Sequence, residues 1–388
     1  MAILVVPSWY KTESNAILGS FFREQAMMLK KKGEEVIVAD ATFQGRADYF
    51  SKRCFKMKKY DDDGLLTYSY VVPALGAFKS KDGGSARYYK NLRKIYKKIV
   101  SDGHKIDLIH AHSYLPAGLA AVRLGKTQNI PVVVTEHASV VLKKQLSEER
   151  ISLLKEVVAE AKAFICVSRA LKKSVQELTN NIREPIIIPN AVDSRFKYSE
   201  RKESDIFTFI SIGNLVRSKR FDLTIEAFSL CFKRNQNVKL KILGEGILRK
   251  ELEELAVKYG IEEQVIFTGR VSRESVVKEL QTAKVFVLPS DYETFGVVYI
   301  EAMACGLPVI GTKNGGAEDI ISRKNGILIE KNNVSLLAKA MKKTYEEYNA
   351  FNCENIAREC QRNYGEETIS ERILETYKNR RKKRIYDE

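Results

Sequence analysis

Long hydrophobic runs are what this 388-residue sequence most clearly lacks. No apolar stretch approaches the roughly 18–20 residues that a membrane-spanning helix requires. The first residues, MAILVVPSWY, place no basic region before a short apolar stretch, so we expect a β-strand there and not a signal peptide. Both absences predict a cytoplasmic chain without a helical membrane span.

The cysteines lack any spacing that is typical of metal ligands. They are scattered along the chain at Cys54, Cys166, Cys231, Cys305, Cys353 and Cys360. We therefore expect reduced thiols, as in a cytosolic protein, and no metal bound by cysteine.

Signatures of nucleic-acid-binding modules are also missing, whether paired zinc ligands or an aromatic RNA-recognition motif. Positive charge is what the chain has in excess, with a formal net charge of +16. Basic residues cluster at 30–32, 56–59, 90–98, 143–144 and 380–384. An excess of this size suits nucleic acid, an anionic membrane surface or an anionic substrate, although any one cluster could simply be a solvated helix face. We expect no nucleic-acid partner.

Chain length and the order of patterns indicate two α/β domains. Apolar, strand-like runs alternate with helical patterns, which is typical of parallel sheets with crossover helices. The interdomain linker is expected over 186–205, giving domains 1–196 and 197–365. Strands are predicted at 3–6, 36–39, 65–72, 108–111, 132–135 and 164–167, then at 208–212, 239–243, 265–268, 285–288, 309–311 and 327–329. Two doubly wound domains bind ligands in the crevice beyond the carboxyl ends of their strands.

The most informative segment is LPSDYETFGVVYIEAMACGLPVIGTKNGG, residues 288–316. A buried strand is predicted to end at its start, and a helix is predicted over 294–304. Glu293 then lies just before a helix N-terminus, where unpaired amides and the helix dipole favour phosphate. Glu301 follows about two turns later. A carboxylate beside an anion site is suited to bind hydroxyls and not the phosphate itself. Phosphate and hydroxyls together indicate a nucleotide sugar as ligand. The alternative is that Glu293 and Glu301 are simply solvated helix carboxylates.

A second segment, SIGNLVRSKRFDLTIEAF, covers residues 211–228 and follows the first strand of the second domain. Its glycine turn at Gly213 precedes three cations within four positions, at Arg217, Lys219 and Arg220. This arrangement suits a diphosphate that must leave as an anion, whereas a solvated basic loop is the alternative interpretation.

Two further groups suggest metal sites but are better explained otherwise. DLIHAHSYLPAG, residues 107–118, puts His110 and His112 on one face at the end of a strand. His137 is the only candidate for a third ligand and lacks ligand-like spacing, so hydrogen-bonded structural histidines are the expectation. The run 61–63 of three aspartates precedes a glycine and predicts a turn.

Residues 293–310, ETFGVVYIEAMACGLPVI, closely resemble the donor-site signature of retaining glycosyltransferases of family 4. The resemblance implies the GT-B fold, in which two Rossmann-like domains face a central cleft and a terminal helix, here 366–388, crosses back onto the first domain. It also implies a nucleotide diphosphate sugar as donor and transfer with retention of configuration.

Site roles follow from the same resemblance. It implies that Glu293 contacts the donor sugar, that Glu301 binds the ribose, and that Lys219 and His112 join Glu293 as catalytic residues. Asn214 stands where the family has arginine and Arg220 where it has glycine, which leaves the second cation of the diphosphate site open. The implied donor-binding residues are Gly19, Gly213, Asn214, Arg217, Lys219, Arg220, Glu293, Thr294, Phe295, Gly296, Val297, Val298 and Glu301.

We therefore expect a retaining hexosyl- or N-acetylhexosaminyl-type transferase that needs neither a cofactor nor a metal ion. A UDP-sugar is favoured over a GDP-sugar as donor. The preferred acceptor is a lipid-linked saccharide in bacterial surface polysaccharide synthesis, because the segment 88–100 is basic and amphipathic. In that segment Leu92, Ile95 and Ile99 form one face, which predicts peripheral binding to the inner face of the cytoplasmic membrane.

Three alternatives remain open on the sequence. The chain could be a transferase with a small soluble acceptor, or a non-catalytic basic module that binds membranes or nucleic acid. A hydrolysing nucleotide-sugar epimerase would share the fold, but the spacing of Glu293 and Glu301 argues against it.

Overall fold

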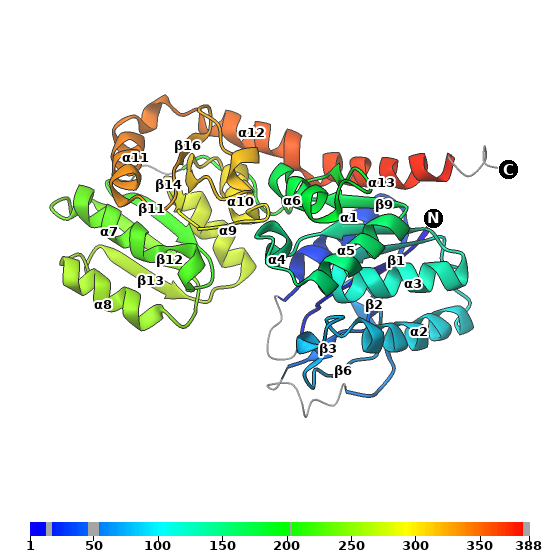
Figure 1. Ribbon diagram of the computed structural model, residues 1–388. Coiled ribbons are helices and arrows are strands. Elements are labelled where there is room, and N and C mark those ends of the chain that lie inside the picture. The colour runs from blue at the N-terminus through cyan, green and yellow to red at the C-terminus, as the bar shows by residue number, and fades with distance from the viewer. Residues whose placement is uncertain (13–17, 46–53, 202–203, 383–388) are drawn as a thin grey trace. The chain divides into compact units, whose positions relative to one another are not determined.

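The computed structural model describes residues 1–12, 18–45, 54–201 and 204–382, and the chain forms two compact units (Figure 1). Unit 1 comprises Met1–Pro189 and Ile369–Glu388, and unit 2 comprises Asn190–Thr368. Among the described residues, no helix has the length and apolarity that crossing a membrane requires.

Within the described residues, unit 1 is built on an eight-stranded sheet of order β10-β9-β8-β7-β1-β2-β5-β4. All neighbouring strands pair in parallel except β4 and β5, which are antiparallel. The strands are β1 (Ala2–Pro7), β2 (Glu35–Asp40), β4 (Lys58–Asp62), β5 (Leu65–Ser69), β7 (Leu108–His112), β8 (Val132–Glu136), β9 (Ala163–Cys166) and β10 (Ile186–Ile187). A separate short pair joins β3 (Phe43–Gln44) to β6 (Val72–Pro73).

The helices of unit 1 pack around this sheet. The longer helices are α1 (Ser20–Lys31), α2 (Ser85–Ser101), α3 (Leu119–Gln128), α5 (Glu148–Glu160), α6 (Arg169–Thr179) and α13 (Glu366–Lys382), and α4 (Ser139–Leu142) is short. The strand order reverses direction between β1 and β7. Ligands of doubly wound sheets bind beyond the carboxyl ends of strands at such a switch point.

Unit 2 has a six-stranded, all-parallel sheet of order β13-β12-β11-β14-β15-β16 in the part of the chain that the structure describes. Its strands are β11 (Phe207–Ile212), β12 (Val238–Leu243), β13 (Val265–Gly269), β14 (Val285–Leu288), β15 (Val309–Thr312) and β16 (Gly326–Ile329). Its helices are α7 (Phe221–Phe232), α8 (Arg249–Tyr259), α9 (Arg273–Thr282), α10 (Val297–Ala304), α11 (Val334–Glu346) and α12 (Cys353–Tyr364). The switch point of this sheet lies between β11 and β14.

The chain joins unit 2 at Asn190, slightly before the predicted boundary at 196. Val192 pairs with Gly365 in an isolated bridge, and the buried Phe196 accepts a hydrogen bond from Gln361 through its carbonyl, so this segment belongs to the second unit. Helix α13 belongs to unit 1 from Ile369 onward, and residues 383–388 of the predicted terminal helix lie outside the described residues.

Helix α2 corrects one prediction. Leu92, Ile95 and Ile99, expected to form the apolar face of a membrane-surface helix, are fully buried in unit 1, where α2 packs against α3, β2 and β5. The apolar stripe serves the core and is not available to a bilayer. The exposed face carries six cations and no acidic residue: Arg87, Lys90, Arg93, Lys94, Lys97 and Lys98.

The turn predicted for the aspartate run at 61–63 is confirmed only for Asp63, because Asp61 and Asp62 are the last residues of β4. Strands β4 and β5 are joined through Asp63 and Gly64, whose φ angles are 48° and 94°. Positive φ at both central residues matches a type I′ hairpin, whose twist fits the flanking strands.

Three histidines lie together in the interior of unit 1, at the ends of β7 and β8. The ring centroids of His110 and His112 are 4.6 Å apart, and His112 Nδ1 lies 3.2 Å from His137 Nε2. Burial lowers the pKa of His110 and of His137 to about 3, and it holds the pKa of His112 well below the ordinary histidine value. All three rings are therefore neutral at physiological pH.

Glu136, the last residue of β8, is a buried carboxylate that accepts three backbone amides. Its Oε1 accepts from His137 N at 2.7 Å and Ala138 N at 2.6 Å, and its Oε2 accepts from Tyr114 N at 2.8 Å. Burial raises the pKa of Glu136 to about 7, and the amides oppose that shift. Because Tyr114 follows β7 and His137 follows β8, the carboxylate ties the two strand ends together.

We expect the stability of unit 1 to fall as the pH is lowered from 6 to 5. Unfolding releases three histidines whose ordinary pKa is about 6.5, so they take up protons. Glu136 acts in the opposite direction, because its raised pKa contributes stability at low pH that is lost toward pH 7. Net uptake of about two protons should lower the free energy of unfolding by up to about 2.7 kcal/mol per pH unit. Urea unfolding followed by Trp9 fluorescence measures this, since Trp9 is the sole tryptophan and belongs to unit 1.

His110→Gln provides the matched control, because glutamine removes one titrating group at a buried site. The dependence on pH should fall to about one proton, whatever the change in absolute stability. A free energy of unfolding that is constant or rises on acidification in this window would show that the histidines are not neutral in the folded protein.

Candidate active site

The loops that leave β11 and β14 meet at the switch point of unit 2. The first loop contains Gly213 to Lys219, and the second contains Ser290 to Gly296. A backbone hydrogen bond of 2.8 Å from Asp291 N to Ser218 O joins them directly. The two segments that the sequence singled out are therefore brought together at one edge of the sheet.

Lys219 and Glu293 form an ion pair across this junction. Lys219 Nζ lies 2.5 Å from Glu293 Oε1, and both side chains keep some exposure, 24% and 13% respectively. Glu293 is held from the other side because its amide donates to Asn314 O at 3.0 Å. A cation and a carboxylate thus share one partly exposed position, where each could contact a ligand.

The N-terminus of α10 lies in the second loop. Gly296 has φ 94°, and a Cβ there would come within 2.5 Å of the Tyr299 ring, so the turn into the helix requires glycine. The Tyr299 hydroxyl donates to Leu288 O at 2.7 Å, which anchors the helix to the end of β14. The side chains of Val297 and Val298 are partly exposed, as is Thr294, whereas Phe295 is buried. Unpaired amides at such a helix start suit an anion.

Asn314 orders this loop and was not recognised from the sequence. Its side-chain oxygen accepts from Gly316 N at 3.2 Å and Ala317 N at 3.0 Å, while its carbonyl accepts from Glu293. A Cβ on Gly316 would lie 2.3 Å from Phe295 O, so the loop after β15 packs closely on the start of α10. Only the unusual density of small and polar residues at 312–316 could have indicated this role.

The cations beside Lys219 differ in their partners. Arg220 pairs with Asp222 at 3.0 Å and Asp291 at 3.4 Å, and it also donates to Asn332. Arg217 is exposed and forms no ion pair with any residue that the structure describes. Asn214 is exposed too, and Gly213 packs beside the aliphatic stem of Lys219.

Glu301 lies in an environment that the sequence did not predict. It is 2% exposed, and its Oε1 lies 2.6 Å from Arg273 Nη2 on the first turn of α9. The Arg273 guanidinium in turn lies 4.6 Å from the centroid of the Phe196 ring. A single arginine far away in the sequence gave no signal of this contact.

In unit 1, His112 lies at the carboxyl end of β7. This strand is next to β1, at the switch point of the sheet of unit 1. The Phe22 ring, on α1, lies 4.6 Å from the His112 ring between centroids. His110 is bound on both sides, by Thr135 Oγ1 at 2.7 Å and by the Tyr377 hydroxyl at 2.6 Å. The described residues contain no group of three or more potential metal ligands.

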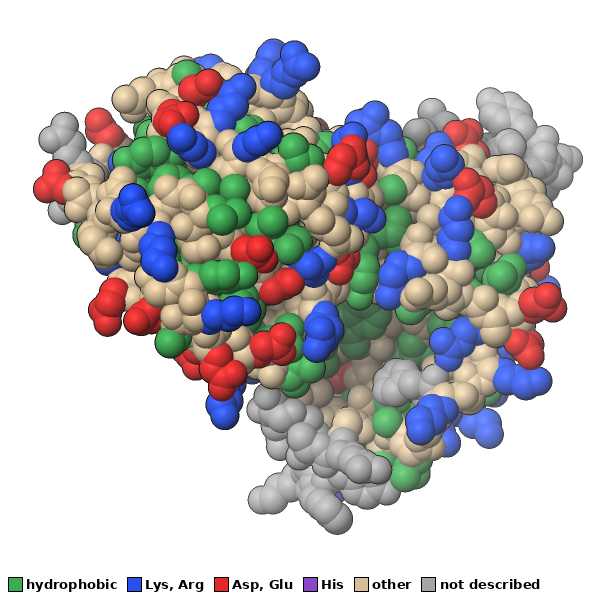
Figure 2. Space-filling view, turned by 60° about the vertical axis from the view of Figure 1, so that its left-hand side comes forward, with side chains coloured by type: hydrophobic (Ala, Val, Ile, Leu, Met, Phe, Trp, Pro, Cys, Tyr) green, Lys and Arg blue, Asp and Glu red, His purple; other side chains and the backbone are tan. Residues whose placement is uncertain are grey.

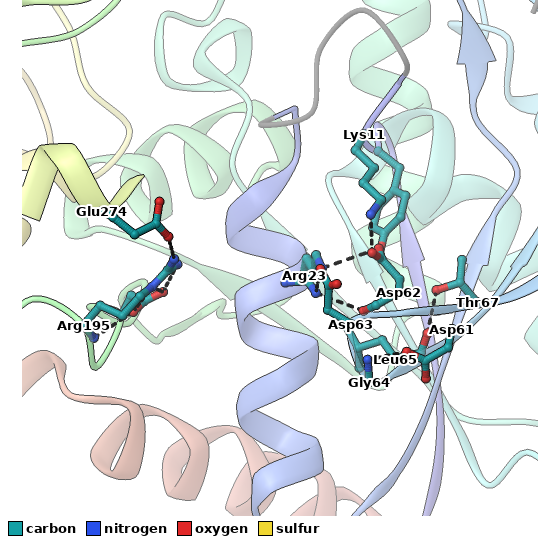
Figure 3. A network of polar contacts seen from close by, with 12 residues as sticks. Lys11, Arg23, Asp61, Asp62, Asp63, Gly64, Leu65, Thr67, Arg195 and Glu274 are labelled. Atoms are coloured by element: carbon teal, nitrogen blue, oxygen red, sulfur yellow. Dashed lines mark hydrogen bonds and ion pairs between the residues drawn. The ribbon is translucent and has the colours of Figure 1, made fainter. Parts of the chain in front are cut away.

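Asp62 is nearly fully buried and holds the first residues after β1. Figure 3 shows Lys11 and Arg23 directed at its carboxylate. Tyr10 donates to it at 2.7 Å, Lys11 pairs with it, and Arg23 Nε lies 3.4 Å away. Tyr10 is therefore buried against the end of β4. Gly19 has φ 73° at the start of α1, and a Cβ there would lie 2.7 Å from Trp9 O, which accounts for the glycine structurally.

Family models match almost the whole chain. The model described as Glycosyltransferase Family 4 matches residues 18–196, and the one described as Glycosyl transferases group 1 matches residues 193–367. The two matches correspond closely to the two units of the structure.

Similar proteins agree with these matches. An uncharacterised glycosyltransferase of Methanocaldococcus jannaschii is 33% identical over 284 residues, 72% of this chain and 76% of that protein. A protein of Bacillus subtilis named for teichuronic acid biosynthesis, the glycosyltransferase TuaC, is 26% identical over 88% of each chain. The crystal structure of Anabaena HepE with UDP has a TM-score of 0.76 at 20% identity and covers 98% of this chain and 100% of its own. With its two doubly wound units and these family matches, the chain is a glycosyltransferase of family 4 with the GT-B fold.

Proposed function

We propose that the protein is a retaining, metal-independent transferase that moves a hexosyl or N-acetylhexosaminyl group from a UDP-sugar to an acceptor hydroxyl. The proposed acceptor is a lipid-linked saccharide of a bacterial surface polymer, and the proposed place of action is the inner face of the cytoplasmic membrane. The observation that carries the proposal is the Lys219–Glu293 pair at the start of α10.

Charge development in the reaction explains why these groups are needed together. Cleavage of the anomeric C–O bond leaves a sugar with oxocarbenium character and a departing diphosphate. Lys219 and the amides at the start of α10 are positioned to stabilise the leaving charge. Glu293, released from Lys219 by the incoming phosphates, can accept hydrogen bonds from sugar hydroxyls.

Arg217 is the proposed second cation of the diphosphate site. Arg220 is already neutralised by Asp222 and Asp291, so moving it to a ligand would leave those carboxylates uncompensated. Arg217 has no such commitment among the described residues and lies in the same short helical turn, Arg217–Lys219.

Support for the donor and the acceptor comes from separate observations. The structurally similar HepE has been crystallised with UDP and with UDP-glucose, which favours a uridine nucleotide. The relative TuaC is named for a cell-surface polymer. The exposed face of α2 offers six cations to an anionic surface. On the face of the molecule that Figure 2 shows, Lys and Arg are interspersed with Asp and Glu.

Lys219→Ala should lower turnover of a UDP-sugar by roughly 10²–10³, the scale for losing one group that stabilises developing charge. Arg217→Ala should lower it by a smaller factor, and Arg220→Ala least, because the Arg220 charge is already balanced. Release of UDP is measured in EDTA throughout. Loss of wild-type activity in EDTA that a divalent ion restores would contradict metal independence, and an Arg220 effect above that of Arg217 would reverse the assignment of the second cation.

The two glutamates should respond differently to substitution by glutamine. Glu301 is proposed to bind the ribose, so Glu301→Gln should weaken the binding of free UDP by tenfold or more. A hydrogen bond to a charged group contributes about 1.5–3 kcal/mol. Glu293→Gln should bind UDP no more weakly than wild type, since it frees Lys219, yet it should turn over poorly. Calorimetric titration with UDP separates the two, and thermal melting checks that each variant is folded. If only Glu293→Gln bound UDP more weakly, the proposed roles of the two glutamates in binding the sugar and the ribose would have to be exchanged.

Binding to anionic vesicles should be reversible and should weaken with salt. Each cation near such a surface contributes about 1 kcal/mol, screened over about 8 Å at physiological ionic strength. Replacing Lys90, Arg93 and Lys97 by glutamine, which spares the Lys98–Asp102 pair, should release the protein from the vesicles.

The matched control replaces Lys339, Lys342 and Lys343, three exposed lysines of α11 in unit 2. It removes the same charge and should retain vesicle binding. Equal loss in both variants would mean that net charge, and not the α2 face, determines the association.

A further inference from the structure

The hydrogen bond between His112 and His137 constrains where the protons of both rings lie. His112 Nδ1 and His137 Nε2 are 3.2 Å apart, and both side chains are buried. A neutral imidazole carries one N–H and one lone pair, so two neutral rings can bond only if one of these two nitrogens is protonated and the other is not.

The surroundings keep both rings neutral. The His110 ring and the Phe22 ring each lie 4.6 Å from the His112 ring between centroids. Burial lowers the pKa of both His112 and His137, and His110 adds to this effect because a like charge nearby disfavours protonation. Glu136, the last residue of β8, directs its oxygens at backbone amides.

The other nitrogen of His137 distinguishes the two possible arrangements. His137 Nδ1 is buried and has no hydrogen-bond partner among the described residues. If His112 donated, His137 would carry its proton on Nδ1, as a buried N–H without an acceptor. If His137 donates from Nε2, Nδ1 holds only an unused lone pair. In folded proteins a buried N–H group without an acceptor is rarer than a buried lone pair without a donor. The arrangement in which His137 donates from Nε2 is therefore favoured.

We propose that His137 donates from Nε2 to His112 Nδ1 and thereby fixes His112 as the Nε2–H tautomer. His112 then acts as a hydrogen-bond donor toward its ligand, and His137 is a positioning residue that does not contact the ligand. The inference rests on the proposed function only for the identity of the accepting atom, an oxygen of the donor sugar.

Glu136 provides the rigidity that this arrangement needs. By binding the amides of Tyr114 and His137, it fixes the exits of β7 and β8, the strands that carry the two rings. The 3.2 Å contact is thus maintained by the backbone and not only by the rings themselves.

Nitrogen NMR of the full-length protein labelled with ¹⁵N-histidine tests the tautomer without any substrate. The chain has four histidines, so four ring systems are expected, and His112→Gln identifies one by its disappearance. His112 should show a protonated Nε2 and an unprotonated Nδ1, and His104→Gln should leave those shifts unchanged, because His104 pairs with Glu35 away from the cluster. A protonated Nδ1, or an even mixture of tautomers, would overturn the proposal.

Two substitutions of His137 test the consequence for turnover. Glutamine places an amide donor near the position of Nε2, whereas leucine offers none. His137→Leu should lower turnover about tenfold and give His112 a mixture of tautomers, while His137→Gln should stay within about threefold of wild type. Affinity for UDP should be unchanged in both, because Lys219, Glu301 and the start of α10, the proposed nucleotide contacts, lie in unit 2. Equal losses in the two variants would overturn the donor role, whereas inactivity of the wild type would count against the proposed function alone.

Discussion

The order of parallel strands is the constraint on which the site depends. In each unit the first strand, β1 or β11, lies beside a strand from the second half of its sheet, so the connections diverge and leave their loops exposed at that edge. Most residues proposed for ligand binding lie on a loop or helix start at one of these two edges, whereas His112 ends β7 and Glu301 lies within α10. The ion pair of Lys219 and Glu293 exists because β11 and β14 are neighbours, although 74 positions separate the residues.

Most of the fold could be predicted because buried parallel strands are short apolar runs in the sequence. All twelve predicted strands are present, with bounds that shift by a residue or two, except that the run predicted at 65–72 divides into β5 and β6. The missed strands β3, β4 and β10 are short or polar: β4 reads KKYDD and lies at the sheet edge, where one face is solvated. Periodicity carries little signal in such strands.

The site could be predicted where its residues are contiguous and not where they come from distant segments. Glu293 and the start of α10 lie in one motif, and their local environment follows from the strand–loop–helix pattern. Arg273 and Asn314 reach the same edge through other connections, so only tertiary structure reveals them. The reversed role of the apolar stripe of α2 has the same origin, because amphipathicity alone does not say whether the stripe meets a core or a membrane.

Net charge is a poor guide to where this protein binds anions. Around the proposed diphosphate site most cations already have carboxylate partners, Lys219 with Glu293 and Arg220 with Asp222, so the site carries little excess charge before a ligand arrives. The proposed function therefore assigns affinity for phosphate largely to the start of α10 and to an exchange of partners, in which phosphate replaces Glu293 on Lys219. In the proposed mechanism this exchange couples the two events, since Glu293 becomes free for the sugar only when the diphosphate has taken Lys219. Helix α2 of the other unit differs, because only Lys98 among its six exposed cations has a carboxylate partner among the ion pairs of the described residues.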